Sequence, residues 1–334
     1  MSWTALRVFI IELPHVDFLR LTISYCDATL NSPVDLAVKD VNRKSSVRLY
    51  AILAREAPVA VVFRRGPSKE VLLSLWRTDS DEFAEGQWFK GRIYERRCDL
   101  SPGGKLLIYL AAKYKEPHAW TAISKPPYLS ALAMWMKQHT WGGGGLFARE
   151  DEILLNHSPD EMNLAEGFRL PRYVKVKPCG EYSGRGENSP IMDTRMSRDG
   201  WRLIQDGKWI EHKIGSPVWI EFEEPQIWQK PNPKREDYEL VYKLAGIHER
   251  DGPAHLIDRL IVGKESDLEL GRTDWADWCH SGDLLFAKEG KIFRLGFDHN
   301  EKLRSLDQAT LLRDFNECRF EAKESPAEAK VWDE

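Results

Sequence analysis

The sequence predicts an all-β fold made of several antiparallel sheets, with helix as a minor component. Short runs rich in β-branched and aromatic residues begin near Leu49 and continue to about residue 315, separated by polar or Gly-containing turns. A degenerate phrase, in which a Ser-containing turn precedes a small apolar run, recurs along this stretch. Tryptophan is frequent, at 13 of 334 residues, and its large ring with one polar N–H suits half-buried sheet surfaces.

The spacing of the recurring phrase indicates the architecture. The phrase contains Ser101, Ser197 and Ser281, with a weaker form at Ser158, and successive serines are 57, 39 and 84 positions apart. The last interval is twice 42, and repeats of about 40 to 50 residues are expected for the blades of a propeller. We therefore predict a β-propeller-like fold with five or six antiparallel blades.

The predicted strands are short and are bounded by Pro, Gly, Asp or Ser. They are expected at residues 50–53, 59–64, 71–76, 91–97, 105–112, 120–124, 152–156, 173–177, 201–204, 209–212, 218–222, 238–244, 255–262, 284–288 and 291–295. The last two strands flank Glu289-Gly290, which is typical of a tight hairpin turn. Apolar residues have helical spacing at 128–137 and 303–315, where short helices are expected.

Three regions follow from this pattern. Residues 1–48 lack the blade pattern and are expected to be an N-terminal extension or a set of ring-closing strands. Residues 49–315 are predicted to form the β-propeller-like domain. Residues 316–334 are predicted to be a charged C-terminal tail, whose charged end is expected to fray.

Two segments carry a resemblance to a known family. They read Leu100-Ser-Pro-Gly-Gly-Lys-Leu-Leu-Ile-Tyr109 and Trp275-Ala-Asp-Trp-Cys-His-Ser-Gly-Asp-Leu-Leu-Phe286. Both resemble the Ser-Pro-Asp-Gly-Lys blade turn of TolB-like and WD40-type β-propellers. The resemblance extends in loosened form over residues 50–315, without a Gly-His and Trp-Asp pair in each repeat and with an irregular period. It implies a rigid scaffold for binding, which both enzymes and interaction proteins use.

Composition narrows the classes of partner. Lys and Arg number 48 and Asp and Glu number 52, so the formal net charge of −4 argues against nucleic acid and against an anionic membrane as partners. We identify no signal peptide and no apolar stretch long enough to span a membrane, and we expect a cytoplasmic protein. The five cysteines lie far apart without a Cys-x-x-Cys pair, which fits a reducing compartment and predicts no metal site.

The most basic stretch is Arg92-Ile-Tyr-Glu-Arg-Arg97. In a strand, Arg92, Tyr94 and Arg96 would share one face, about 6.5 to 7 Å apart in steps of two residues, and Arg97 would face the other way. Two guanidinium groups beside an aromatic ring suit a phosphate or carboxylate. These three residues are the predicted ligand-binding set, and a solvent-facing strand with Glu partners is the alternative.

Other candidates are weaker. Trp88 and Trp141 lie close to Gly in the sequence, and their rings are candidates for contact with a ligand, although packing between blades is the alternative. Gly142-Gly-Gly-Gly145 resembles an anion-binding loop in composition, but no Gly-x-Ser-x-Gly or Gly-Lys-Ser/Thr motif accompanies it, and a tight turn between strands is favoured. The His and Asp residues of the turns around His157 and His280 have no fixed metal spacing. No catalytic set, metal or cofactor is predicted.

We expect a non-catalytic binding or interaction protein on a β-propeller-like scaffold, with a protein or a small anionic ligand as its partner. The alternative is a propeller hydrolase that acts on a glycan or a phosphoester at the loop end of the disc. Clustered carboxylates or histidines in the central channel would favour the enzyme. Whether the chain is an enzyme is left open, with binding alone favoured.

Overall fold

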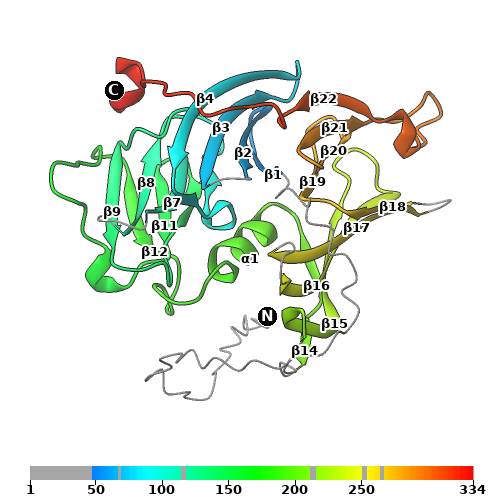
Figure 1. Cartoon of the computed structure of the whole chain (residues 1–334), viewed down its shortest axis with the longest axis horizontal. Helices are drawn as coiled ribbons and strands as arrows, with labels where there is room; N and C mark the ends of the chain where they lie inside the picture. The colour runs from blue at the N-terminus through cyan, green and yellow to red at the C-terminus, as the bar shows by residue number, and fades with distance from the viewer. Residues whose placement is uncertain are drawn as a thin grey trace, which may run out of the picture. The chain divides into compact units, whose positions relative to one another are not determined.

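The computed structural model describes residues 47–66, 69–113, 118–210, 216–249, 254–263 and 267–333, all within the compact unit Lys44–Glu334. The described residues form five sheets of mostly antiparallel strands (Figure 1). This confirms the predicted all-β, β-propeller-like class, with a blade number at the lower of the two expected values. The predicted extension at residues 1–48 lies, apart from its last two residues, outside the described residues.

The sheets follow one another along the chain. The first sheet contains β1 (Arg48–Leu53), β2 (Val59–Arg65), β3 (Glu70–Arg77) and β4 (Glu82–Lys90). The second contains β5 (Arg92–Ile93), β6 (Asp99–Leu100), β7 (Leu107–Ala112), β8 (Ala119–Ser124) and β9 (Ala133–Lys137). The third contains β10 (Gly145–Arg149), β11 (Glu152–Leu155) and β12 (Lys175–Pro178), the last pairing parallel to β11.

The fourth sheet is the largest and contains the longest strands. Its members are β13 (Arg202–Gln205), β14 (Lys208–Ile210), β15 (Val218–Pro231), β16 (Tyr238–Glu249), β17 (His255–Gly263) and β18 (Leu268–Arg272). The fifth sheet contains β19 (Trp275–Trp278), β20 (Leu284–Lys288), β21 (Lys291–Leu295) and β22 (Thr310–Asp314). The helical elements are α1 (Ser189–Arg198) and the 3-10 turns η1 (Glu95–Arg97), η2 (Pro159–Glu161), η3 (Leu306–Gln308) and η4 (Ala327–Lys330).

The Ser101, Ser281 and Glu289-Gly290 segments form turns, as their residue types predict. Ser101 lies in the turn between β6 and β7, where its hydroxyl accepts a hydrogen bond from the Leu106 amide (3.2 Å). The Ser281 turn joins β19 to β20 and is closed by the Gly282 amide bonding to the Cys279 carbonyl (2.9 Å). Glu289 and Gly290 both have positive φ, at 54° and 75°, as a two-residue hairpin turn requires.

Apolar side chains from neighbouring sheets interlock and form the core. Phe63 and Tyr109 pack in the cluster between the first and second sheets, and Trp135 and Phe147 pack between the second and third. Trp228 and Phe286 belong to the cluster that joins the fourth and fifth sheets, to which α1 contributes Met196. Each cluster buries large apolar surfaces, which is the main stabilising term of such a fold.

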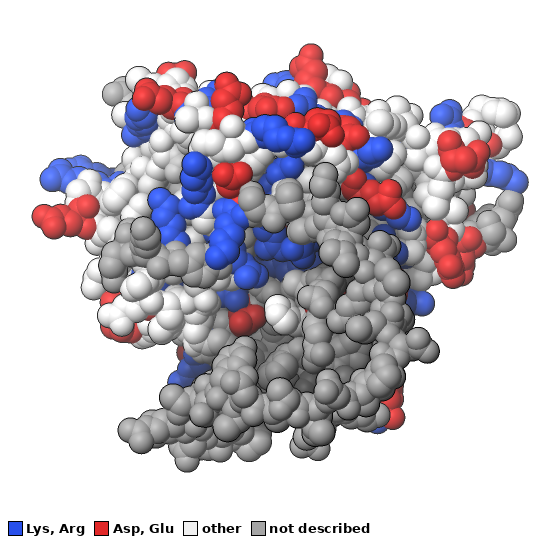
Figure 2. Space-filling view, in the orientation of Figure 1, with Lys and Arg blue, Asp and Glu red and all other residues white. Residues whose placement is uncertain are grey.

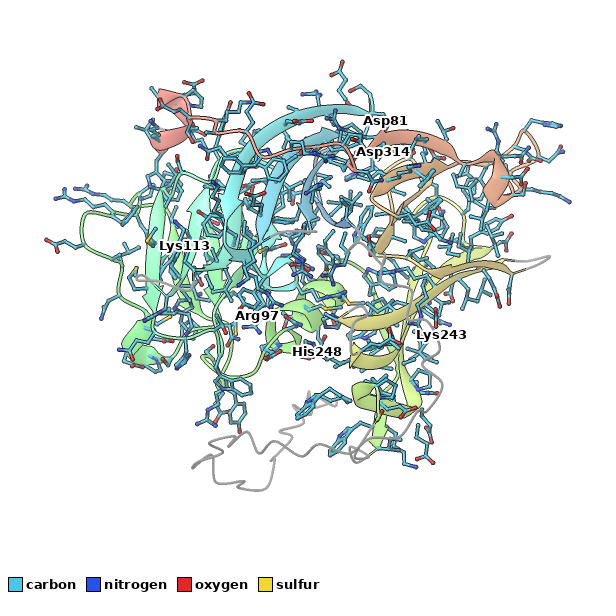
Figure 3. The ribbon with its side chains drawn as sticks, in the orientation of Figure 1. Asp81, Arg97, Lys113, Lys243, His248 and Asp314 are labelled. Atoms are coloured by element: carbon cyan, nitrogen blue, oxygen red, sulfur yellow. The ribbon has the colours of Figure 1, made fainter. Side chains whose placement is uncertain are left out.

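The last sheet packs against the first, so the sheets follow one another around a circle. Trp76 of β3 and Leu285 of β20 share a buried cluster. The Leu49 amide donates to the Asp274 carboxylate (3.1 Å), and Arg294 of β21 binds Asp81, which follows β3 (2.7 Å; Figure 3). Helix α1 contacts β10 of the third sheet and β13 of the fourth, and thereby links these two sheets.

Three local expectations are wrong. Residues 128–137 were predicted to be helical, but β9 occupies their second half, because Ala133, Trp135 and Lys137 are buried with a period of two. Residues 303–315 contain η3 and β22, and β22 is held as a strand by its pairing with β21. The Ser197 turn is the end of α1 and does not belong to a hairpin, although Trp201 is followed by the predicted strand, β13.

The C-terminal segment packs on the sheets where fraying was expected. The indole N–H of Trp332 donates to the Leu132 carbonyl (3.2 Å), and Ser130 and Ser325 form a hydrogen bond (2.6 Å). Phe320 lies beside Trp88, with ring centroids 6.1 Å apart. These contacts connect the segment after β22 to the first and second sheets. The described helices include none that is long and apolar enough to cross a membrane.

Candidate functional site: a cationic inner cavity

A cavity of about 430 Å³ lies among the inner strands of the sheets. Its wall is formed by β1, β19, η1, α1 and parts of β15, β16 and β17. Strands β1 and β19 run side by side in the same direction. Two hydrogen bonds show this, since the Leu49 amide bonds to Asp274 at one end and the Arg55 carbonyl bonds to the His280 ring at the other (3.0 Å). The cavity therefore extends along strands that belong to the first and the last sheet.

Cations outnumber anions in the cavity wall. The lining residues include six cationic side chains and two carboxylates, namely Arg55, Arg96, Arg195, Arg198, Lys230 and Arg259 against Asp199 and Asp277. Two of these cations are neutralised. Arg198 binds Asp99 through two nitrogens, one at 2.9 Å, and Lys230 binds Asp277 (2.6 Å).

Three other arginines, Arg96, Arg195 and Arg259, are buried without a carboxylate, and we call them the arginine cluster. Their exposed fractions are 8%, 5% and 3%. Within the described ranges none of them has an Asp or Glu oxygen within 4 Å. Burial of an unpaired charge is costly, and burial lowers the pKa of Arg259 to about 10.

Aromatic rings take the place of carboxylates in the arginine cluster. The guanidinium carbons of Arg96 and Arg195 lie 5.3 and 5.6 Å from the centroid of the Tyr50 ring. The guanidinium carbon of Arg259 lies 5.4 Å from the centroid of the Tyr242 ring. Cation–π contacts of this kind hold the guanidinium planes but leave many of their N–H donors free.

The donors of the arginine cluster are unequally used. Arg195 donates to the Cys98 carbonyl and to the Tyr50 hydroxyl, and Arg259 donates to Thr273. Arg96 donates to the sulfur of Met192 (3.4 Å), and interactions with the nearby Tyr242 hydroxyl favour its charged form. The Arg259 Nε and the Tyr242 hydroxyl are buried without a hydrogen-bond partner of good geometry among the described residues. Arg96 is therefore the cation with the largest unused capacity to bind an anion.

The predicted residues Arg92, Tyr94 and Arg96 do not share a face, because their segment is not one strand. Strand β5 ends at Ile93 and η1 follows, so the alternation of faces stops at Tyr94. Tyr94 lies between Arg92 and Arg97, whose guanidinium carbons are 4.6 and 4.9 Å from its ring centroid. Arg96 reaches the cavity alone, and Arg92 is exposed.

Arg97, which was expected to face away from Arg92 and Arg96, is a structural residue. It is 2% exposed, and its guanidinium donates to the carbonyls of Thr140 and Gly142 (2.9 Å to Gly142) and to Asn188 Oδ1 (3.2 Å). Asn188 immediately precedes α1, and Figure 3 shows Arg97 beside this helix. Arg97 thus joins η1 to the glycine loop and to the start of α1.

The glycine loop Gly142–Gly145 is a close-packed turn. Its amides are used internally, since Gly142, Gly143 and Gly144 donate to Gly186, Asn156 and Thr121, respectively. Gly144 has φ +81°, and a Cβ there would lie 2.3 Å from the Arg97 carbonyl oxygen. The amides do not converge on an open site, so the tight turn predicted as the alternative is confirmed.

The two tryptophans proposed for ligand contact have different surroundings. Trp88 lies in β4 between the Arg64 guanidinium, 5.3 Å from its ring centroid, and the Phe320 ring. Trp141 is 52% exposed in the loop between β9 and β10. Neither lines the cavity. Their role in binding stays a prediction.

The turn histidines make hydrogen bonds that account for their positions. His157 accepts from the Thr121 hydroxyl (2.8 Å) and donates to the Glu161 carbonyl (3.1 Å), which corresponds to a neutral ring. Asp283 binds Arg294 (3.0 Å). In the part of the chain that the structure describes, no group of three or more His, Cys, Asp or Glu side chains is arranged to hold a metal ion.

The sequence predicted one residue of this site, Arg96, as a binding residue and did not indicate the others. Arg195, Arg259, Tyr50 and Tyr242 come from four other elements, and no local pattern marks them. A weak signal existed for Arg195, because a basic residue on the same face as Met192 and Met196 at helical spacing indicates a partly polar environment.

Comparisons with known proteins show similarity only to solved structures. No family model and no curated protein matches the chain. A putative 6-phosphogluconolactonase from Bacteroides fragilis aligns at 10% identity over 83% of this chain and 98% of that one, with a TM-score of 0.31. The β-propeller domain of the Trilobed protease from Pyrococcus furiosus aligns at 10% identity over 82% and 100%, with a TM-score of 0.24.

An acylaminoacyl peptidase in complex with Z-Gly-Gly-Phe-chloromethyl ketone aligns at 10% identity over 79% of this chain and 40% of that chain, with a TM-score of 0.23. At TM-scores this low, none of these proteins informs the function of the cavity. The β-propeller-like class rests on the five sheets and on the packing of the last sheet against the first.

Proposed function

We propose that the protein is a non-catalytic binding protein that holds a small anionic ligand in its inner cavity. The observation that carries this proposal is the arginine cluster, three buried guanidinium groups that face aromatic rings in place of carboxylates. An oxyanion would accept the unused N–H donors of Arg96 and Arg259 and the hydrogen of the Tyr242 hydroxyl. It would also offset the cost of burying three like charges.

Three further statements belong to the proposal. A cytoplasmic location is supported by the free thiols of Cys98, Cys179, Cys279 and Cys318, which fit a reducing compartment. A kinship with TolB-like or WD40-type propellers is supported by the Ser101 and Ser281 turns, each of which lies between paired strands. A protein is the other kind of partner, and the phosphate assay below tests the small anionic ligand alone.

Replacing Arg96 with glutamine should weaken binding of inorganic phosphate by about 10- to 100-fold. The loss corresponds to about 1.5–3 kcal/mol for one hydrogen bond to a charged group. Isothermal calorimetry at constant ionic strength measures it. Arg77→Gln is the control, because Arg77 is exposed, lies beside Asp79 and does not line the cavity.

Equal phosphate affinity in the two variants, or no binding of phosphate to the parent protein, would contradict the proposal. Incubation with phosphoester and glycoside substrates tests the hydrolase alternative on the same preparations. Turnover that is lost in Arg96→Gln would overturn the non-catalytic assignment and place the hydrolase in the same cavity.

A further inference from the structure

A second group of cations lies where β1 begins, two residues before Tyr50 of the cavity wall. Arg48 and Arg65 are directly opposite one another in the β1–β2 ladder, although like charges in opposite positions destabilise a sheet. Burial and the neighbouring Arg65 lower the pKa of Arg48. Arg92, the exposed residue of β5, also acts electrostatically on Arg48. We call Arg48, Arg65 and Arg92 the outer arginines.

The outer arginines are incompletely neutralised. Arg65 lies 3.5 Å from the Glu95 carboxylate, and within the described ranges neither Arg48 nor Arg92 has a carboxylate oxygen within 4 Å. Figure 2 shows Lys and Arg side chains gathered near the middle of the face in view. Asp274 also acts electrostatically on Arg48 and Arg65, so two carboxylates face three guanidinium groups and an excess of positive charge remains.

His255 connects the outer arginines to the arginine cluster. It begins β17, is partly buried, and lies 3.3 Å from the Asn188 amide nitrogen. Burial and then the charges of Arg96, Arg65, His248 and Arg92 lower the pKa of His255 to about 2. The geometry gives the same link, because Arg65 pairs with Glu95, the residue before Arg96, at 3.5 Å. Arg48 also lies two residues before Tyr50, whose ring contacts Arg96. His248 lies near the end of β16 (Figure 3).

We propose that the ligand is a small polyanion, with one anionic group at Arg96 inside the cavity and a second at the outer arginines. This inference rests on the proposed function and adds the chemical class of the ligand. The inner group would be recognised by desolvated guanidinium donors, and the outer group by Arg48 and Arg65, which are partly buried, and by the exposed Arg92. Linking two anionic groups in one molecule makes the second contact intramolecular and raises affinity without a second binding event.

The test compares inorganic phosphate, pyrophosphate and tripolyphosphate by calorimetry at one ionic strength. The parent protein should bind tripolyphosphate at least about ten-fold more tightly than phosphate. Arg92→Gln and Arg48→Gln should each remove much of the difference in affinity between tripolyphosphate and phosphate. Arg96→Gln should weaken all three ligands. Arg77→Gln is the control, because Arg77 is exposed and lies beside Asp79 at 4.0 Å.

The outcomes separate the two proposals. The polyanion inference is wrong, and the proposed function stands, if phosphate binds through Arg96 but tripolyphosphate binds the parent protein no more tightly than phosphate does. The same holds if Arg92→Gln and Arg48→Gln keep the full affinity gain of the parent protein for tripolyphosphate. If none of the three anions binds, both are wrong. Both outer substitutions remove a cation that lacks a carboxylate, so the variants should fold, which circular dichroism verifies.

Discussion

Asp99→Asn should destabilise the protein by about 3–5 kcal/mol, the range expected when a buried ion pair loses one partner. The Asp99 side chain is fully buried, and its two oxygens bind Arg198, one of them at 2.9 Å. One of these oxygens also accepts the Phe147 amide (2.8 Å). The carboxylate therefore joins β6, β10 and α1, and its neutral amide would leave Arg198 with Asp199 as its remaining carboxylate partner (2.8 Å).

Urea unfolding, with the midpoint and slope fitted together, measures this loss. Asp79→Asn is the matched control, because Asp79 is exposed and 4.0 Å from Arg77, and it should cost less than about 1 kcal/mol. Adding Arg198→Met to Asp99→Asn should recover much of the stability, since the buried cation is then removed. Equal losses for Asp79→Asn and Asp99→Asn would show that the buried pair has no special role.

Acid should unfold the protein partly through His157. Burial, and then the nearby Lys137 ammonium, lower the pKa of His157 from 6.5 to about 4. The His157 ring binds a proton at higher pH in the unfolded chain than in the folded one. Its contribution to the free energy of unfolding is therefore complete above about pH 6.5 and is lost as the pH falls toward 4. Between pH 7 and pH 5, protonation linked to His157 alone should lower the free energy of unfolding by about 2 kcal/mol.

His157→Gln isolates that contribution. Its free energy of unfolding should fall between pH 7 and pH 5 by about 2 kcal/mol less than that of the parent protein. His299→Gln, a change at an exposed histidine, should reproduce the pH dependence of the parent. A His157→Gln curve parallel to that of the parent would show that the ring already binds a proton in the folded state.

Turn chemistry and strand composition in the sequence were sufficient to predict the fold class. Gly282, Gly290 and the Ser101 hydroxyl act through bonds between near neighbours in the chain, so their role is visible locally. Helix α1 was not predicted because the local residue types at its end are also those of a hairpin turn. It ends at Arg198, and the Asp199-Gly200 that follows has the residue types of a hairpin turn.

The site depended on contacts that no local pattern contains. The Arg92–Arg97 segment was correctly identified as the basic one, but η1 interrupts the alternation and sends Arg96 toward Tyr50, more than 40 residues away. Arg195 and Arg259 join it because α1 and β17 line the same cavity as β1 and β19. The sequence by itself determined short-range features: turns, strands and the location of basic residues. The tertiary structure decided which guanidinium groups are buried together, because burial and charge pairing depend on long-range packing.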